Sequence, residues 1–446
     1  MNRQRNRGRV TLASLAAMCA VAVLPGQARA ADGPGSYTFD PAATEVRGAE
    51  TNAEASELKP GAVYKSSIGV GEKLYYRLEL DDRTDAYVSA VVVPRTAGQV
   101  AYGDGVTISV RDLDDLRCSS EDAVFESAEF PRPIAAYAHR TVEKDSTTCG
   151  AAGTYNVLIE RESKATSAAD PWDLELRVET EPALKDGDTP PTEAPENWPS
   201  ASPTPPSGKQ KRTGGSSYYD ATSLDSGEWV DTVAPGQTRF YRVPVDWDQQ
   251  IFATAALSNN NKSTEFLGNA LAVALDNPAH GHVDDATLSY AGKPTSVALD
   301  PLPPVRYENR YASASAVSAM RFAGWYYLSV TLSPKVAEHF GDTPIGLTLK
   351  INVLNEAGTT PYQGDAGVFG VTDGDRDMAK NGQSALDAGR SDTMKIVAAA
   401  GIGAGTVLVL GLGAWTLLAR RRTVPAAAVQ PVADGQPPFG GPPQAW

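Results

Sequence analysis

The chain has 446 residues and a formal net charge of −14, with 54 acidic and 40 basic residues. The first 30 residues hold five Arg and no acid, whereas residues 31–395 hold 53 acidic and 32 basic residues, a balance of −21. This acidity excludes a protein that binds nucleic-acid phosphates, which needs clustered Lys and Arg. The length excludes a single small domain, because a chain of this size usually forms about two or three units.

The N-terminus predicts a secretory signal peptide over residues 1–30. Four alternating Arg residues precede the apolar stretch Val10 to Leu24, and an Ala-Arg-Ala site follows that ends at Ala30. This is the three-part pattern of a signal that is removed on export, with cleavage after Ala30. The apolar stretch is short for a membrane-spanning helix, so we expect an exported mature chain.

Residues 34–184 and 216–356 are predicted as two strand-rich domains. Apolar and polar residues alternate in both, as in the run that contains Leu74, Tyr76 and Leu78. Such alternation is typical of strands with one buried face. No convincing amphipathic helix pattern occurs outside the two ends of the chain.

The two domains are predicted to be copies of one module. Four sequence blocks recur in the same order, at offsets that begin at 165 and grow to 171 and 173 as insertions in loops accumulate. The clearest matches are GEKLYYRLEL (Gly71–Leu80) with GQTRFYRVPV (Gly236–Val245), GTYNVLI (Gly153–Ile159) with GWYYLSV (Gly324–Val330), and PWDLELRV (Pro171–Val178) with PIGLTLKI (Pro344–Ile351).

The predicted fold class is all-β, with two tandem jelly-roll-like β-sandwich domains plus one C-terminal transmembrane helix. The opening motifs GEKLYYR and GQTRFYR and the closing motif G-x-Y resemble those of the bacterial pre-peptidase C-terminal domain, a jelly-roll-like sandwich. This resemblance implies a Tyr or Phe on each opening strand, near Tyr75-Tyr76 and Phe240-Tyr241. It implies a Gly and a Tyr on each closing strand, at Gly153 and Tyr155 and at Gly324 and Tyr326. No peptidase domain accompanies the modules in this chain.

Cys118 and Cys149 are the two thiols that remain after a signal peptide containing Cys19 is removed. Disulfides are the usual state of paired cysteines in exported proteins. We therefore expect a bond between them, closing a loop of about 30 residues.

A Pro-, Ser- and Thr-rich segment separates the two domains and reads as a semi-extended linker. The chain is predicted to have seven segments. They are a signal peptide (1–30), the first sandwich (34–184), the linker (185–215), the second sandwich (216–356), a flexible juxtamembrane stalk (357–395), a transmembrane helix (396–419) and a disordered cytoplasmic tail (420–446).

The stretch Ile396–Ala419 has 24 residues without a charge. At about 1.5 Å per residue it spans roughly 36 Å, enough to cross a bilayer. Three Arg follow it directly, and the positive-inside bias places them in the cytoplasm. We therefore expect a single-pass type I protein of the cell membrane, with its N-terminal bulk outside. Gly401 and Gly405 have the small-xxx-small spacing that can pair two such helices into a dimer.

Four residues form the best metal-like cluster in the sequence, His280, His282, Asp284 and Asp285. Imidazole and carboxylate groups close together are typical of transition-metal sites. The segment between Pro278 and Gly292 also reads as a long exposed loop, in which these residues would be ordinary solvated side chains. Both interpretations stay open.

Acidic runs provide weaker candidates for calcium. Asp373, Asp375 and Asp377 have the spacing of a calcium loop, but Met378 and Ser384 stand where such a loop needs Gly and a carboxylate. Other acidic strings, around Asp81 and around Asp112, are expected to be solvated loop ends. Low-affinity binding of extracellular calcium at any of them is kept as an alternative.

Motifs for catalysis or cofactor binding are missing from the sequence. There is no G-x-S-x-G elbow, no H-E-x-x-H, no P-loop and no dinucleotide-binding glycine pattern. The leading hypothesis is a non-enzymatic cell-envelope surface protein without a cofactor, whose duplicated modules bind an extracellular protein or glycan. The alternatives are a calcium-dependent carbohydrate-binding or assembly module and, ranked lower, an unrecognised envelope hydrolase.

Overall fold

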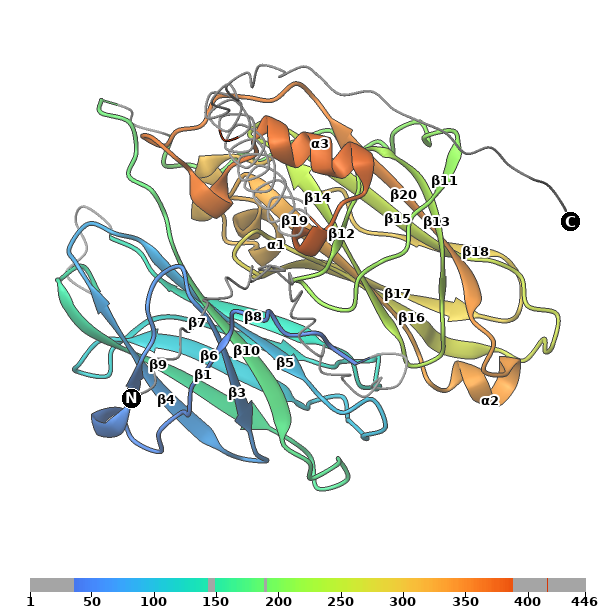
Figure 1. Cartoon of the computed structure of the whole chain (residues 1–446), viewed down its shortest axis with the longest axis horizontal. Helices are drawn as coiled ribbons and strands as arrows, with labels where there is room; N and C mark the ends of the chain where they lie inside the picture. Colours follow the sequence, from blue (N-terminus) through green and yellow to red (C-terminus); the bar gives the residue numbers. More distant parts are fainter. Residues whose placement is uncertain (1–35, 143–148, 188–190, 388–414, 416–446) are drawn as a thin grey trace, which may run out of the picture.

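The structure, a computed structural model, describes residues 36–142, 149–187, 191–387 and 415 (Figure 1). Several predictions lie outside these residues: the signal peptide with its cleavage site at Ala30, the helix Ile396–Ala419 apart from Trp415, the Gly401 and Gly405 pair, and the tail 420–446. Within the described part of the chain, none of the helices is both long and apolar enough to span a membrane.

The first sandwich consists of two five-stranded sheets. Sheet 1a has the order β1-β3-β10-β5-β8, with β1 at Thr44–Glu45, β3 at Val63–Ile68, β10 at Trp172–Thr180, β5 at Ala86–Val93 and β8 at Ile134–Arg140. Sheet 1b has the order β2-β4-β9-β6-β7, with β2 at Ser56–Glu57, β4 at Lys73–Leu80, β9 at Gly153–Glu162, β6 at Gly105–Arg111 and β7 at Arg117–Val124. A short 3-10 helix η1 covers Asn52–Glu54.

The second sandwich repeats this arrangement. Sheet 2a has the order β11-β13-β20-β15-β18, with β11 at Lys209–Lys211, β13 at Gly227–Val233, β20 at Ile345–Leu354, β15 at Gln250–Leu257 and β18 at Thr295–Ala298. Sheet 2b has the order β12-β14-β19-β16-β17, with β12 at Thr222–Ser223, β14 at Thr238–Val245, β19 at Gly324–Leu332, β16 at Leu267–Asp276 and β17 at His282–Tyr290. Short helices lie in its loops and after it: η2 at Tyr307–Tyr311, α1 at Ser315–Ala319, α2 at Val336–Phe340, η3 at Gly367–Phe369 and α3 at Asp373–Asn381.

Strand order and register confirm the internal repeat. Each strand of the second sandwich occupies the position of the strand ten places earlier in the first. The pairing of Leu80 with Gly153 recurs as Val245 with Gly324, at the offsets of the sequence blocks. The matching sequence blocks therefore correspond to equivalent strands.

The two sandwiches pack face to face, so that four sheets are stacked in the order 1b, 1a, 2b, 2a. On β5, Val88 and Val92 face the core of the first sandwich, whereas Val91 packs with Phe240 and Tyr327 of sheet 2b. Seven of the eight residues of β5 are buried, because both of its faces are covered. A strand with one solvated face would show alternation instead.

Chain segments outside the predicted domains also take part in this packing. Within the predicted linker range, β11 pairs in parallel with β13. In the range predicted as a flexible stalk, Tyr362 and Phe369 are buried, and α3 packs against β12 and β14. Residues 183–185 and 361–363 form antiparallel backbone hydrogen bonds, so the chain after β20 returns to the end of the first sandwich. We call residues 357–387 the strap.

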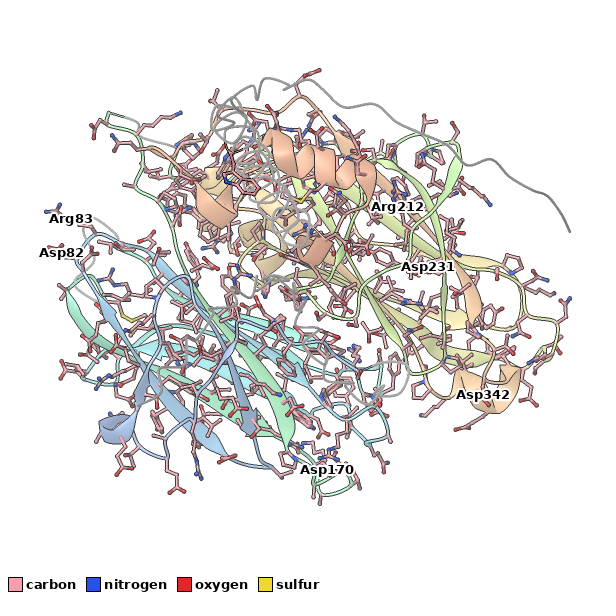
Figure 2. The ribbon with its side chains drawn as sticks, in the orientation of Figure 1. Asp82, Arg83, Asp170, Arg212, Asp231 and Asp342 are labelled. Atoms are coloured by element: carbon pink, nitrogen blue, oxygen red, sulfur yellow. A yellow bond between two sulfur atoms is a disulfide. The ribbon has the colours of Figure 1, made fainter. Side chains whose placement is uncertain are left out.

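Two buried Arg close the ends of the first sandwich. Arg140 donates to the carbonyls of Asp81, Thr84 and Ala151 at one end. Arg161 donates to carbonyls of the loops at the other end, including that of Asp170, and its guanidinium lies 3.6 Å from the ring centre of Trp172. Figure 2 labels Asp82 and Arg83 at the first end and Asp170 at the other. These cations satisfy loop carbonyls that would otherwise be buried without partners.

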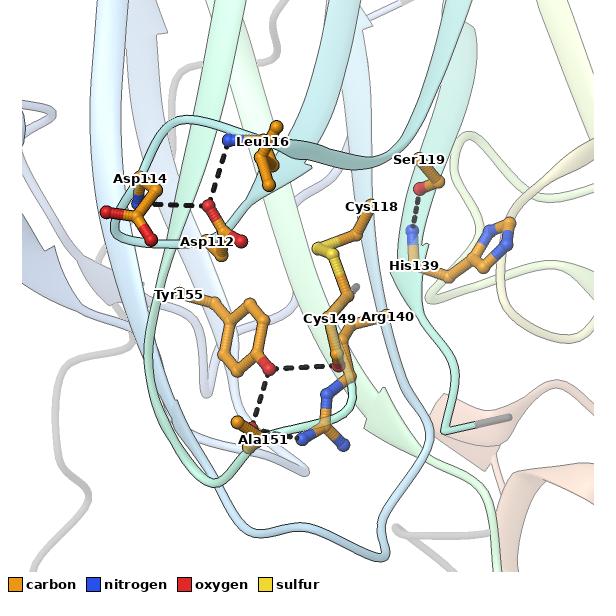
Figure 3. Close-up of a disulfide and its surroundings, with 10 residues drawn as sticks. All are labelled: Asp112, Asp114, Leu116, Cys118, Ser119, His139, Arg140, Cys149, Ala151 and Tyr155. Carbon is orange, nitrogen blue, oxygen red and sulfur yellow. Dashed lines mark hydrogen bonds between the residues drawn. A yellow bond between two sulfur atoms is a disulfide. The ribbon is translucent and has the colours of Figure 1, made fainter. Parts of the chain in front are cut away.

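The disulfide between Cys118 and Cys149 is confirmed, with the two Cα atoms 5.7 Å apart (Figure 3). Beside it, the Tyr155 hydroxyl donates to the carbonyls of Cys149, at 2.9 Å, and Ala151, at 2.6 Å. The equivalent Tyr326 donates to the carbonyl of Phe322, again four residues earlier, at 2.8 Å. The repeated G-x-Y motif thus ties the start of each closing strand to the loop before it, as in a tyrosine corner.

Candidate functional site

The polar centre of the junction between the sandwiches is the carboxylate of Glu181, which follows β10. It accepts hydrogen bonds from the hydroxyls of Tyr87 and Tyr362, each at 2.7 Å, and from the guanidinium of Arg310. These donors come from the first sandwich, the strap and the second sandwich. Glu181 is 7% exposed, so the three segments meet at a buried ion pair.

Aromatic rings surround this ion pair. Tyr87 contacts Phe322 of the second sandwich and Phe369 of the strap, with ring centres 4.9 and 5.8 Å apart. Tyr137 lies against Gly281, where an added Cβ would stand 2.2 Å from its ring. The backbone of the β16–β17 turn therefore reaches the first sandwich only because residue 281 has no side chain.

A small cavity of about 130 Å³ lies between β7 and β8 on one side and sheet 2b on the other. We call it the side cavity. It gathers His282, Asp276, Asp285 and Ser329, which is the combination that a hydrolase with an unrecognised site would need. The ring of His282 has Nδ1 3.6 Å from Asp276 Oδ1 and Nε2 3.4 Å from Asp285 Oδ1.

This geometry is that of an ion-paired imidazolium. Burial opposes protonation of His282, but hydrogen bonding and charge attraction from Asp276 and Asp285 outweigh it and hold its pKa well above the usual value. A general base needs a free lone pair on the imidazole at neutral pH. With both ring nitrogens facing carboxylates, His282 is poorly arranged to take a proton from Ser329.

A larger cavity of about 350 Å³ lies where both sandwiches and the strap meet. We call it the junction cavity. Its walls come from the outer face of sheet 1a, the outer face of sheet 2b, the β16–β17 turn, the N-terminal segment and the strap. The lining residues with chemical interest are Asp40, Glu175, Arg177, Tyr218, Arg242, His280, Trp325, Tyr327 and Asp375.

His280 presents an unsatisfied imidazole to the junction cavity. It is 1% exposed, stacks on Tyr218 at 4.2 Å between ring centres, and neither ring nitrogen has a hydrogen-bond partner among the described residues. Burial, assisted by the charge of Arg177, lowers its pKa well below the usual value, so the ring is neutral. A neutral imidazole offers one donor and one acceptor. Buried polar groups normally have partners, so this ring marks the wall of the junction cavity as a candidate binding site.

Glu175 is a second buried polar group in this cavity, and it lies beside the hydroxyl of Tyr37. It is 4% exposed, and its Oε2 has no hydrogen-bond partner among the described residues. Burial raises its pKa to about 7, against an opposing effect of Arg177. The cavity therefore contains a carboxyl that exchanges its proton near neutral pH.

The structure separates the four residues proposed as a metal cluster. His282 and Asp285 face the side cavity, His280 faces the junction cavity, and Asp284 accepts a hydrogen bond from the backbone of Asp300 at 2.8 Å. The expectation of an exposed loop between Pro278 and Gly292 is wrong, because β17 occupies most of it. Over the described residues, no group of three or more His, Cys, Asp or Glu side chains is placed to hold a metal ion.

Carboxylates of the acidic runs accept hydrogen bonds from backbone amides in turns and at a helix N-terminus. Asp112 Oδ1 accepts from the amides of Asp114 and Leu116, which closes the β6–β7 turn (Figure 3). Asp81 Oδ1 accepts in the same way at the β4–β5 turn. Asp375 belongs to the capping box of α3, so the segment with calcium-like spacing forms a helix.

Sequence reasoning missed the residues that build the junction. Arg242 and Tyr327 lie next to core residues in strands that were predicted to have one solvated face. A signal was present in Ala86–Val93 (AYVSAVVV), which is nearly continuously apolar and so typical of a strand covered on both faces. Nothing local in the sequence identifies the partner of that second face.

Comparisons with known proteins identify no family. No family model matches the chain, and no curated protein is similar to it. The chain is distantly similar to the CUB1-EGF-CUB2 domains of rat MASP-1, at 6% identity over 67% of this chain and 100% of that one, with a TM-score of 0.17. It is also similar to the CBM22-1–CBM22-2 tandem of Paenibacillus barcinonensis Xyn10C, at 11% identity over 66% and 92%, with a TM-score of 0.17. Scores this low carry no argument about function, and the pre-peptidase resemblance stays a prediction.

Proposed function

We propose that the protein is a non-enzymatic, single-pass cell-envelope protein that presents its two β-sandwiches outside the membrane and binds an extracellular glycan in the junction cavity. The export signal, the apolar stretch and the pre-peptidase-like motifs of the sequence support the location and the module type. The observation that carries the binding role is the junction cavity, which combines aromatic rings with buried polar atoms that have no hydrogen-bond partner among the described residues.

The size of the cavity favours a sugar residue over a protein surface. Small-ligand sites usually enclose about 300–1,000 Å³, whereas a stable protein interface buries about 800 Å² on each partner. The large apolar side chains that the described residues expose, such as Tyr102, Leu113 and Phe266, are spread over loops of both sandwiches.

Aromatic and polar groups in the cavity match the chemistry of a sugar. Trp325 and Tyr327 supply apolar faces for C–H groups, and the neutral His280 supplies a donor and an acceptor for hydroxyls. Glu175 can accept or donate near neutral pH. A polyhydroxylated ligand uses both functions at once.

The test is binding of the detergent-solubilised full-length protein to immobilised glycans. We expect saturable binding by the wild type. His280→Asn should weaken it by about tenfold, because a hydrogen bond between the neutral imidazole and a sugar hydroxyl is lost. Asn tolerates the left-handed backbone of residue 280, whose φ is 58°. His339→Asn, at a partly exposed position in α2, is the matched control and should leave binding unchanged. Equal loss in both variants, or no binding of any glycan by the wild type, contradicts the proposal.

A further inference from the structure

The junction cavity contains a buried cation that lacks a carboxylate partner. Arg242 on β14 is 5% exposed, and none of the salt bridges within 4.0 Å among the described residues involves it. Its Nε donates to Ser223 Oγ at 2.9 Å, its Nη2 lies 3.8 Å from Met378 Sδ, and the guanidinium stacks 4.1 Å from the ring centre of Trp325. Buried charges are normally paired, because desolvation without compensation is costly.

The other cation of the cavity is already neutralised. Arg177 on β10 forms an ion pair with Glu179 on the same face of its strand. Arg242 has no such salt bridge within the described part of the chain, and the hydrogen bond with Tyr327 and the charge of Asp375 only partly offset the effect of burial on its pKa. Burial lowers the pKa of Arg242, but a guanidinium remains protonated at any physiological pH.

The aspartates that line the cavity are hydrogen-bonded to other groups and form no salt bridge with Arg242 within 4.0 Å among the described residues. Asp375 Oδ1 accepts from Trp325 Nε1 at 2.9 Å, and its Oδ2 accepts from the amide and hydroxyl of Thr372. Asp40 Oδ1 accepts from the amide of Ala42 at 2.8 Å. Glu175 has a pKa raised to about 7 by burial and is therefore partly uncharged at neutral pH.

We propose that the glycan bound in the junction cavity is acidic, and that Arg242 recognises the carboxylate of a uronic acid residue while Trp325, Tyr327 and His280 contact the sugar ring. This inference rests on the proposed glycan-binding function and adds the ligand class. A planar guanidinium matches a carboxylate through two parallel hydrogen bonds, and such charge-assisted bonds are roughly twice as strong as neutral ones.

Four soluble probes test the inference with the detergent-solubilised full-length protein. Calorimetric titration compares the methyl glycosides of glucuronic and galacturonic acid with those of glucose and galactose. We expect at least one uronide to bind about ten- to hundredfold more tightly than its neutral counterpart, which is the range for hydrogen bonds to a charged group. Titration with acetate at the same concentration measures how tightly the cavity binds a carboxylate that carries no sugar.

Variants locate the selectivity. Arg242→Gln should reduce the ratio of uronide affinity to neutral-sugar affinity to about one, with the affinity for the neutral sugar unchanged. Arg242→Lys should retain part of the preference for the uronide. Arg306→Gln, at a partly exposed position of the second sandwich, is the charge-matched control. Melting curves show whether each variant folds. If Arg242→Gln does not fold, Arg242→Lys still tests the inference.

The outcomes separate the two proposals. Equal affinity for neutral and acidic glycosides overturns the acidic-glycan inference and leaves glycan binding standing. Preference for uronides that survives Arg242→Gln overturns the assignment to Arg242. Acetate binding as tightly as the uronides shows a simple anion site and also overturns the inference. Binding of none of the glycosides contradicts the proposed function itself.

Discussion

Glu181 and Arg310 form the buried ion pair that joins the two sandwiches. Arg310 Nη2 lies 2.5 Å from Glu181 Oε1, Nη1 lies 3.3 Å from Oε2, and both side chains are almost fully buried. The charge of Glu181 raises the pKa of Arg310 well above its usual value, although burial opposes this. Because the two residues are 129 positions apart, the pair fixes one sandwich relative to the other.

Arg310→Met should lower the free energy of unfolding by about 3 kcal/mol, because it leaves the carboxylate of Glu181 buried without its cation. Urea denaturation of the detergent-solubilised protein, followed by intrinsic fluorescence, measures the change. Arg306→Met removes the more exposed pair with Asp248 and should change stability by about 0.5 kcal/mol or less. Similar losses in the two variants would contradict the structural role of Arg310.

Removing the disulfide should destabilise the first sandwich. The two Cys are 31 positions apart, and the chain-entropy model assigns a loop of this length about 3 to 4 kcal/mol. The double variant Cys118→Ala/Cys149→Ala should therefore melt at a lower temperature than the wild type under non-reducing conditions. Addition of a reductant should lower the melting temperature of the wild type and leave that of the variant unchanged. A wild type insensitive to reductant would argue against the bond.

The stability of the interface should depend on pH through Glu121. Burial raises its pKa to about 7 from 4.5, and it is faced by His282, Asp276, Arg321 and the backbone of Tyr137. The folded protein therefore retains a proton that the unfolded chain releases, and the contribution of Glu121 to stability falls as pH rises from about 4.5 to 7.

Glu121→Gln removes this dependence. Relative to the wild type, the variant should become more stable between pH 5 and pH 8, as measured by melting temperatures across that range. The comparison with the wild type cancels the opposite trend of His139, whose pKa burial lowers to about 3. Glu54→Gln, at an exposed position, is the control. A constant difference between Glu121→Gln and the wild type at all pH values would refute the assignment.

Proteolysis should cut the chain without separating the sandwiches. We expect the first cleavage within residues 185–215, which are rich in Pro and poor in core-forming residues. Because sheets 1a and 2b pack face to face and the strap contacts both sandwiches, the two fragments should co-elute in gel filtration and separate only under denaturing conditions. Fragments that elute separately in native buffer would contradict the four-layer arrangement.

Calcium at millimolar concentration should leave the melting temperature unchanged. The acidic loops use their carboxylates to accept backbone amides, as at Asp81 and Asp112, which removes ligands that a hard cation needs. The measurement compares melts with calcium and with a chelator. A saturable rise in melting temperature would restore the calcium-dependent alternative.

The sequence by itself determined the features that depend on short stretches of chain. Strand pattern and block order established two copies of one β module, because alternation along a strand reflects the burial of one face. The bond between Cys118 and Cys149 followed from their number and from the expectation of export. The metal interpretation of His280 and His282 depended on adjacency, and a strand with an irregular register places the two rings in different cavities.

Only the tertiary structure decided which second faces are buried and which charges are left unpaired. Val91, Phe240 and Arg242 are ordinary outward positions when each sandwich is considered alone. Stacking of sheet 1a on sheet 2b removes Val91 and Phe240 from water, whereas Trp325 and Met378 of α3 cover Arg242, which forms no salt bridge among the described residues. Burial of this kind arises from contacts between residues more than a hundred positions apart, and no local pattern of sequence records them.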